Sequence, residues 1–324
     1  MFVLSRKLVA VVLALLAGVS FDSGAQSYPA RNITFIWPFN VGTPNGEAFR
    51  VLAEEAGKIL GRPMVTEFRG GAGTRLGVQA LLKAQPDGYL VAAGLGGTYV
   101  VTPIASPSFK IEPGRDYTPV MIATEAYSSL TAHPGLPFRD LRGLIAYARS
   151  NPGKLTFGSP GVGSDSHLHV ERLMAATGIQ MTHIPYKGSA AALPDRLNGT
   201  ISMYMGGLDA APLVTSGQLI AIATTGPSRA ATFASTPTLD ESGAPGLVLK
   251  SWTGLSVPPG TPPGIVARLN LAFTEAFRSP VVIKAMDVGG WAVTPSTPDA
   301  MTARIKSEFE VFGPLVRRLN LNFD

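Results

Sequence analysis

Short apolar runs alternate along the chain with segments in which apolar residues are spaced as in a helix. The run 33–37 is rich in β-branched and aromatic residues and ends at a proline, which is typical of a buried strand. The segment 47–60 places apolar residues three and four positions apart and stops before a glycine, which predicts a helix. The alternation continues with expected strands at 64–67 and 89–93 and an expected helix at 76–84. This order predicts parallel strands joined by right-handed helical crossovers.

The alternation restarts in the middle of the chain. Further helices are predicted at 138–150, 166–177, 191–197, 263–278 and 298–319, and further strands at 154–158, 181–184, 201–205, 220–224 and 252–257. We therefore predict an α/β protein with two domains. Two segments, near 122–132 and 221–228, are expected to cross between them. A cleft between such domains, at the carboxyl ends of the strands, is a preferred place for a small-molecule site.

The first 25 residues have the three parts of a signal peptide. Arg6 and Lys7 precede an apolar run at 8–21, and small residues then lead to Ala25. The run is shorter than the roughly 20 residues that span a bilayer, although an uncleaved anchor is the alternative interpretation. We expect cleavage near Ala25 and export. The expected division is a signal peptide at 1–25, a discontinuous domain 1 at 26–127 and 224–324, and domain 2 at 128–223.

Composition narrows the classes of function. Of the 324 residues, 45% are hydrophobic and 15% are charged, which excludes intrinsic disorder and supplies enough apolar material for two cores. The net charge of +5 is too small for this length to indicate a nucleic-acid partner. Cysteine is absent, which excludes disulfides, thiolate catalysis and cysteine-based metal sites.

Three loops carry the candidate chemistry. The first loop (38–46) joins a strand to a helix, the second loop (94–99) follows a strand, and the third loop (158–167) follows a strand and opens a helix. Glycines let backbone N–H groups approach a ligand, and a helix N-terminus attracts anions without any Lys or Arg. Their hydroxyls add donors at Thr43, Thr98, Ser164 and Ser166. Each loop alone is also compatible with an ordinary turn and a helix cap, but three on one side of parallel strands favour a site.

Enzymatic patterns are weak in this sequence. Ser159 lacks the glycine two residues before it that a nucleophile elbow requires. The glycines at 158–163 stand in the wrong order for a dinucleotide site, and no Walker A motif exists. His167 and His169 are two residues apart, so they face different sides of a helix. His183 is expected to be a hydrogen-bonded core residue. We therefore predict no catalytic residues, no metal and no cofactor.

A series of short segments along the chain resembles a known family. It is similar to the Bug family of periplasmic receptors, the solute-binding components of tripartite tricarboxylate transporters. The resemblance covers nearly the whole chain after the signal peptide. The matching segments are Trp37-Pro38-Phe39, 67–73, Pro86-Asp87-Gly88-Tyr89, 151–155, Phe157-Gly158-Ser159, Gly163-Ser164, Ser166-His167-Leu168, 185–189, 236–239, Ser251-Trp252, Gly254 and 259–262. Their order and spacing together are specific.

The resemblance implies a two-domain fold of the periplasmic-binding-protein type (type II) that closes on a small organic acid in an interdomain cleft. It implies a periplasmic receptor, expected to be a monomer, that delivers its ligand to transporter membrane subunits. Members hold carboxylates with loop amides, hydroxyls and waters. The ligand-binding residues expected here are Phe39, Val41, Gly42, Thr43, Gly96, Thr98, Gly163, Ser164, Asp165, Ser166, His167, Tyr186 and Gly206.

The chain departs from the family pattern in its loops. Thr43 and Gly46 stand where the first loop usually carries a glycine and an aspartate, and Gly206 lies where an aspartate is often found nearby. Asp165 adds a charge that the third loop often lacks, which would oppose an anion or attract an amine if it faced the cleft. The alternatives are a binding protein that reports to a membrane sensor and an exported hydrolase.

Overall fold

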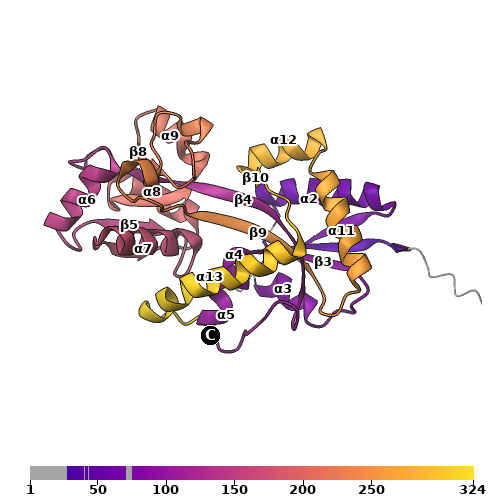
Figure 1. The fold of residues 1–324 in the computed structure, drawn as a ribbon. Helices are drawn as coiled ribbons and strands as arrows, with labels where there is room; N and C mark the ends of the chain where they lie inside the picture. The colour runs from indigo at the N-terminus through magenta and orange to yellow at the C-terminus, as the bar shows by residue number, and fades with distance from the viewer. Residues whose placement is uncertain (1–27, 40, 43, 71–74) are drawn as a thin grey trace, which may run out of the picture.

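The computed structural model describes residues 28–39, 41–42, 44–70 and 75–324, so the predicted signal peptide lies outside it. The described chain forms two lobes joined by long strands (Figure 1). The strands are β1 (Ile33–Trp37), β2 (Met64–Phe68), β3 (Leu90–Leu95), β4 (Thr118–Ala132), β5 (Thr156–Ser159), β6 (Thr182–Pro185), β7 (Met203–Gly207), β8 (Ile220–Thr224), β9 (Lys250–Val257) and β10 (Ala292–Val293).

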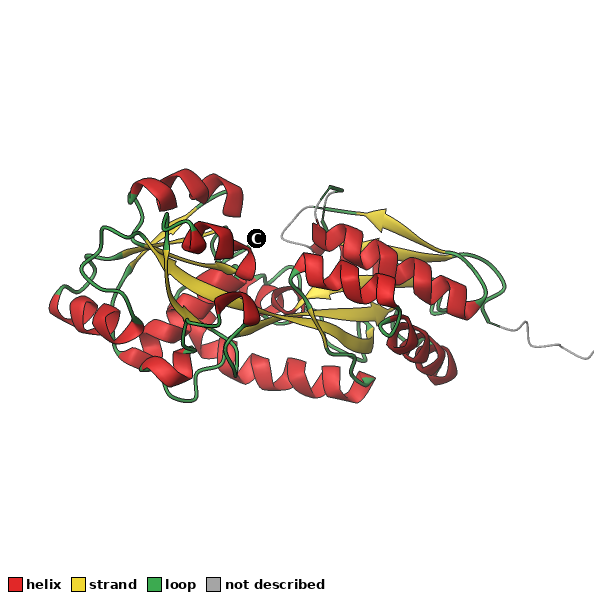
Figure 2. Cartoon of the chain, turned by 90° about the horizontal axis from the view of Figure 1, so that it is seen from above, coloured by secondary structure: helices red, strands yellow, loops and turns green. Residues whose placement is uncertain are grey.

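Helices lie on either side of the strands in both lobes (Figure 2). The α-helices are α2 (Pro44–Leu60), α3 (Arg75–Leu81), α4 (Gly96–Tyr99), α5 (Val101–Ala105), α6 (Leu141–Ser150), α7 (Asp165–Thr177), α8 (Ser189–Asn198), α9 (Ala211–Thr215), α10 (Leu239–Ser242), α11 (Pro263–Ala276), α12 (Pro280–Gly289) and α13 (Pro298–Arg318). Short 3₁₀ turns occupy η2 (Leu208–Ala210) and η3 (Ala231–Phe233). Among the described helices, none is both long and apolar enough to cross a membrane.

The predicted parallel pairing is confirmed in both lobes. In the first lobe β1 pairs in parallel with β2 and β3, and in the second lobe β5 pairs in parallel with β6 and β7. The strands continue into one path, β2-β1-β3-β9-β4-β7-β5-β6, with β8 and β10 each added beside β4. Because the carboxyl ends of parallel strands lie at one edge, the loops that follow them are brought toward the same region.

Two antiparallel strands cross between the lobes. β4 pairs with β9 from Thr118 to Tyr127 and then with β7 from Ser128 to Ala132, so a single strand belongs to both lobes. The first predicted crossing, near 122–132, lies inside β4. At the start of the second predicted crossing, near 221–228, β8 pairs with β4 beside the second-lobe strands, whereas β9 pairs with β4 in the first lobe.

Each lobe has its own hydrophobic core. One core gathers Trp37, Phe49 and Phe273 from the first lobe, and another gathers Leu130, Phe157 and other second-lobe residues. The segment 239–249 contributes to the second of these cores. The division of the chain into domains remains a proposal, and this packing favours a second limit near residue 250 rather than 223/224.

Candidate functional site

The second loop is a helix start packed against an aromatic ring. Instead of the predicted loop at 94–99, β3 runs to Leu95 and α4 begins at Gly96. A Cβ on Gly96 would lie 2.5 Å from the indole Nε1 of Trp252, so only glycine fits there. The ring of Tyr99 stacks on the same indole with centroids 5.8 Å apart. Thr98 is 2% exposed, so its hydroxyl is buried rather than presented to a ligand in this structure.

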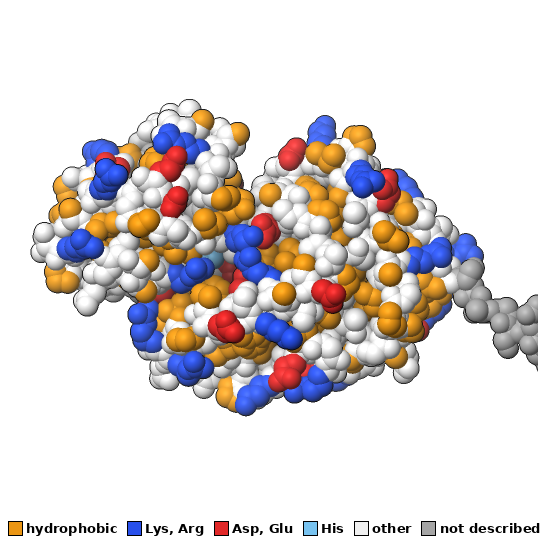
Figure 3. All heavy atoms as spheres, viewed as in Figure 1, with side chains coloured by type: hydrophobic (Ala, Val, Ile, Leu, Met, Phe, Trp, Pro, Cys, Tyr) orange, Lys and Arg blue, Asp and Glu red, His pale blue; other side chains and the backbone are white. Residues whose placement is uncertain are grey.

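A chain of polar contacts connects the crossing strands to α13. The indole Nε1 of Trp252 donates to Oε2 of Glu308 at 2.9 Å, and Nε of Arg304 donates to the other oxygen of the same carboxylate. Burial raises the pKa of Glu308, although its bonds to Arg304 and Trp252 oppose that shift. Lys250 pairs with Glu125, joining β9 to β4. On the face of the molecule seen in Figure 3, Lys/Arg and Asp/Glu side chains gather below a notch between the lobes.

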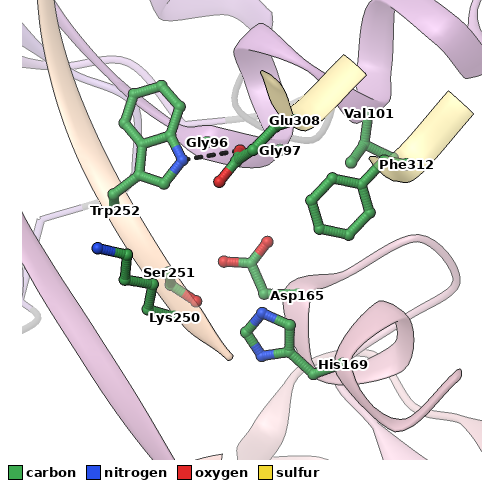
Figure 4. A pocket seen from close by; sticks show the side chains of 10 residues that line it. All are labelled: Gly96, Gly97, Val101, Asp165, His169, Lys250, Ser251, Trp252, Glu308 and Phe312. Atoms are coloured by element: carbon green, nitrogen blue, oxygen red, sulfur yellow. Dashed lines mark hydrogen bonds between the residues drawn. The ribbon is translucent and has the colours of Figure 1, made fainter. Parts of the chain in front are cut away.

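A pocket opens where the second and third loops meet α13 (Figure 4). It is a small, partly open pocket with a cavity volume of about 10 Å³, and it is lined by Gly96, Gly97, Val101, Asp165, His169, Lys250, Ser251, Trp252, Glu308 and Phe312. The carboxylates of Asp165 and Glu308 both point into it. His169 is buried, and burial lowers its pKa to about 4, so it is neutral near pH 7. The acidic side of this pocket disfavours an anion and favours a hydrogen-bond donor.

The third loop is fixed by its own hydrogen bonds. The Ser164 hydroxyl donates to the carbonyl of Gly161 at 2.7 Å and accepts from the backbone N–H of His167 at 3.4 Å, which caps α7. Its single proton is therefore used within the loop. Ser166 lies two residues further on, in the first turn of α7, and is half-buried. In the described part of the chain its hydroxyl has no hydrogen-bond partner. Of the two serines, Ser164 is thus the one that the loop itself uses.

Two histidines stack beneath this loop. His167 was expected to touch the ligand, but it is 4% exposed and accepts a hydrogen bond at Nδ1 from the backbone N–H of Gly163 at 3.0 Å. Its ring lies 3.9 Å from that of His183, and Phe157 stacks on the other histidine at 4.8 Å. Burial, and then the neighbouring His183, lower the pKa of His167 to about 4. His167 therefore supports the loop as a neutral acceptor.

Ser159 and His183 form the contact that most resembles a nucleophile and its base. The Ser159 Oγ lies 2.6 Å from Nε2 of His183, a separation typical of such a pair. However, the serine is 0% exposed and its Oγ also lies 2.9 Å from the carbonyl oxygen of Gly161. The pair therefore lies at the base of the loop. His183 is hydrogen-bonded, as predicted, but it is half-buried rather than part of the core. Among the described residues, no group of three or more His, Asp or Glu side chains is placed to hold a metal ion.

The remaining predicted residues lie in several places. The Tyr186 hydroxyl donates to Asp195 at 2.7 Å, and Gly206 pairs with Ser129 near the end of β7. Phe39 packs on Trp37 in the first-lobe core, while Val41 is exposed. Gly42 adopts the left-handed backbone conformation with φ of 97°, and Thr43 lies outside the described residues.

The structure also brings in residues that the sequence reasoning missed. Trp252 belongs to a segment that matches the family, whereas Glu308 and Phe312 have no motif around them in the sequence. They come from β9 and α13, far from the glycine-rich loops in the sequence, so only the folded chain places them together.

The burial of His167 predicts a loss of stability in mild acid. Its pKa is lower in the folded state than the ordinary value of 6.5, so the unfolded chain binds the proton first as the pH falls. The free energy of unfolding should therefore decrease between pH 6.5 and about 4, by up to the order of 3 kcal/mol from this residue. His167→Asn retains an acceptor for Gly163 but does not titrate. Denaturant unfolding at several pH values should show a shallower acid loss for this variant; an unchanged loss would contradict the assignment.

Comparison with known proteins agrees with this architecture. Residues 48–321 match the family described as "Tripartite tricarboxylate transporter family receptor". The chain is 33% identical over 303 residues to Protein BugT of Bordetella pertussis, covering 93% of each chain.

Two similar structures hold organic acids. MatC from Rhodopseudomonas palustris with bound malate is 29% identical with a TM-score of 0.73, covering 89% of this chain and 100% of that one. Rpa4515 from R. palustris with adipate is 28% identical with a TM-score of 0.75, covering 90% and 97%. The predicted two-lobed α/β fold and its resemblance to Bug receptors are thus confirmed. The chain belongs to the tripartite tricarboxylate transporter receptor family, whose members are extracytoplasmic solute-binding receptors.

Proposed function

We propose that this protein is a periplasmic receptor that binds a small organic carboxylate between its lobes and delivers it to transporter membrane subunits. The observation that carries the proposal is the N-terminus of α7 at the boundary between the lobes. This helix has 13 residues, begins in the third loop, and places Asp165 beside Gly97 of the first lobe. Unpaired N–H groups and the helix dipole favour a carboxylate at such an end.

The similar proteins support the ligand class. The bound molecules named for MatC and Rpa4515, malate and adipate, are both dicarboxylates. No catalytic role is proposed, because the Ser159 hydroxyl of the Ser–His contact described above is fully buried. Export through a signal peptide cleaved near Ala25, and a monomeric receptor, are parts of the same proposal.

A thermal-shift screen tests the ligand class directly. Adipate and malate are compared with 1,6-hexanediol, which has the chain length of adipate but no charge, and with aromatic acids and amino acids. A carboxylate at 100 times its Kd should stabilise the folded protein by about 2.7 kcal/mol and raise the Tm. The diol should leave the Tm unchanged. If the diol stabilises as well as the acids do, or if no carboxylate stabilises, the proposal fails.

The two serines of the third loop should separate binding from folding. Ser166→Ala should lower the affinity for the acid found in the screen by roughly 10- to 150-fold, because one hydrogen bond to a charged group contributes about 1.5–3 kcal/mol. Its unfolding free energy should stay near that of the wild type. Ser164→Ala should instead lower the unfolding free energy by about 1 kcal/mol through loss of the cap. Calorimetric titration and urea unfolding of both variants measure this; normal affinity in Ser166→Ala would remove this serine from the site.

Asp165 should weaken the binding of an anion. Asp165→Asn is therefore expected to strengthen the binding of a simple dicarboxylate by about 1 kcal/mol, or roughly fivefold in affinity. The gain should be smaller at high salt, which screens the repulsion. Asp287→Asn, an exposed carboxylate on α12, is the matched control and should leave affinity unchanged. Weaker binding in Asp165→Asn would show instead that this carboxylate accepts a hydrogen bond from the ligand.

A further inference from the structure

The residues after α13 turn back toward the boundary between the lobes. The end of the chain lies near α5 (Figure 1). There the backbone N–H of Phe323 donates to the carbonyl of Ala105 at 2.9 Å, and Nη2 of Arg75 donates to the carbonyl of Phe323 at 3.4 Å. These contacts place residues 321–324, which we call the tail segment, against the first lobe.

Asp324 anchors the tail segment. Its Oδ2 accepts from the backbone N–H of Ser108 at 2.9 Å, and its Oδ1 accepts from the hydroxyls of Ser106 and Ser108. Nη1 of Arg75 donates to the Ser106 hydroxyl at 3.0 Å and lies 3.8 Å from the same carboxylate. The hydrogen bonds from the two serines lower the pKa of Asp324, so the anchor is ionised at neutral pH.

The ring of Phe323 reaches from this anchor to the other lobe. A Cβ on Gly163 would lie 2.1 Å from Cζ of the Phe323 ring, so the aromatic side chain is pressed against the glycine backbone. Gly163 has a φ of 77°, and its N–H is the group that donates to His167. The third loop is thus held by a second-lobe histidine and by an aromatic ring carried on the first lobe.

We propose that Phe323 is a positioning residue for ligand binding: anchored through Asp324, it holds the third loop in the conformation that presents the N-terminus of α7. This inference rests on the proposed function. The loop contains Gly158, Gly161 and Gly163, and glycine loses more conformational freedom on ordering than other residues. A contact that orders the loop beforehand reduces the cost of ordering it when a ligand binds.

Hydrogen exchange of the ligand-free protein tests the positioning without any ligand. Phe323→Ala should increase the exchange rate of amides at 161–168 by about tenfold, while exchange in α6 stays unchanged. Asp324→Ala should produce the same local effect, because it releases the anchor. Phe323→Leu keeps an apolar side chain and should restore most of the protection. Equal exchange at 161–168 in the wild type and in Phe323→Ala would overturn the proposal.

A pair of glycine variants tests whether the ring acts on Gly163 itself. Gly163→Ala should disturb the loop through both its backbone conformation and its collision with the ring. Adding Phe323→Ala removes the collision, so the double variant should be more stable than Gly163→Ala alone. Gly178→Ala is the matched control: it ends the same helix with φ of 68° but has no atoms near its missing Cβ. Phe323→Ala is also added to Gly178→Ala, where it should have no stabilising effect. If Phe323→Ala stabilises both glycine variants, or neither of them, the contact between the ring and Gly163 is contradicted.

Calorimetric titration with adipate and malate connects the loop to binding. If the wild type binds either acid, Phe323→Ala should raise its Kd by about tenfold. Faster exchange at 161–168 with an unchanged Kd would show that the contact orders the loop without positioning it for the ligand, which overturns the proposal. If the wild type binds neither acid and the wider screen also finds no carboxylate, the proposed function fails, while the exchange experiment still decides whether the tail segment orders the loop.

Discussion

The indole of Trp252 occupies the point at which the two lobes, the crossing strand and α13 come together. Its ring leaves no room for a side chain on Gly96, its Nε1 donates to Glu308, and its face stacks on Tyr99. The same ring lines the pocket beside Asp165. Because protein interiors are close-packed, a movement of β9 at this point must be accommodated by α4 and α13 together. The geometry between the second and third loops therefore depends on this one side chain.

Much of the fold follows from apolar periodicity, and its main omission has a physical cause. The parallel strands are short, apolar and bounded by turns, so their pattern is clear. β4 was missed as a strand because it buries polar residues: the Ser129 hydroxyl donates to Gly207 O and the Thr131 hydroxyl to Tyr204 O. These hydrogen bonds allow the polar residues to be buried, but the same residues interrupt the apolar pattern by which a buried strand is predicted. The sequence predicts a loop in place of α4 because glycine is a poor helix former.

The sequence located the third loop but did not assign its atoms. Ser, Gly and His are the residues that would bind a carboxylate, and they are also the residues that a tight loop uses to satisfy its own backbone. In the structure Ser164 and His167 serve the loop, whereas the hydroxyl of Ser166 is not engaged by the described chain. Glu308 and Phe323 had no local signal, because their partners at Trp252 and Gly163 are distant in the sequence.

Binding of a carboxylate by backbone amides requires that the N–H groups be held in the right positions, and it does not require a charged side chain. A guanidinium on a long side chain can follow a carboxylate that shifts, whereas an N–H group is useful only where the backbone holds it. A loop with several glycines has little intrinsic order, so its conformation must be imposed from outside. His167 does this from within the second lobe and Phe323 from the first. The second contact spans the boundary between the lobes, so the order of the third loop is coupled to the relative position of the lobes. In a receptor of the proposed kind, binding of the ligand by the third loop is therefore coupled to the relative position of the lobes, although no charged protein side chain contacts the ligand.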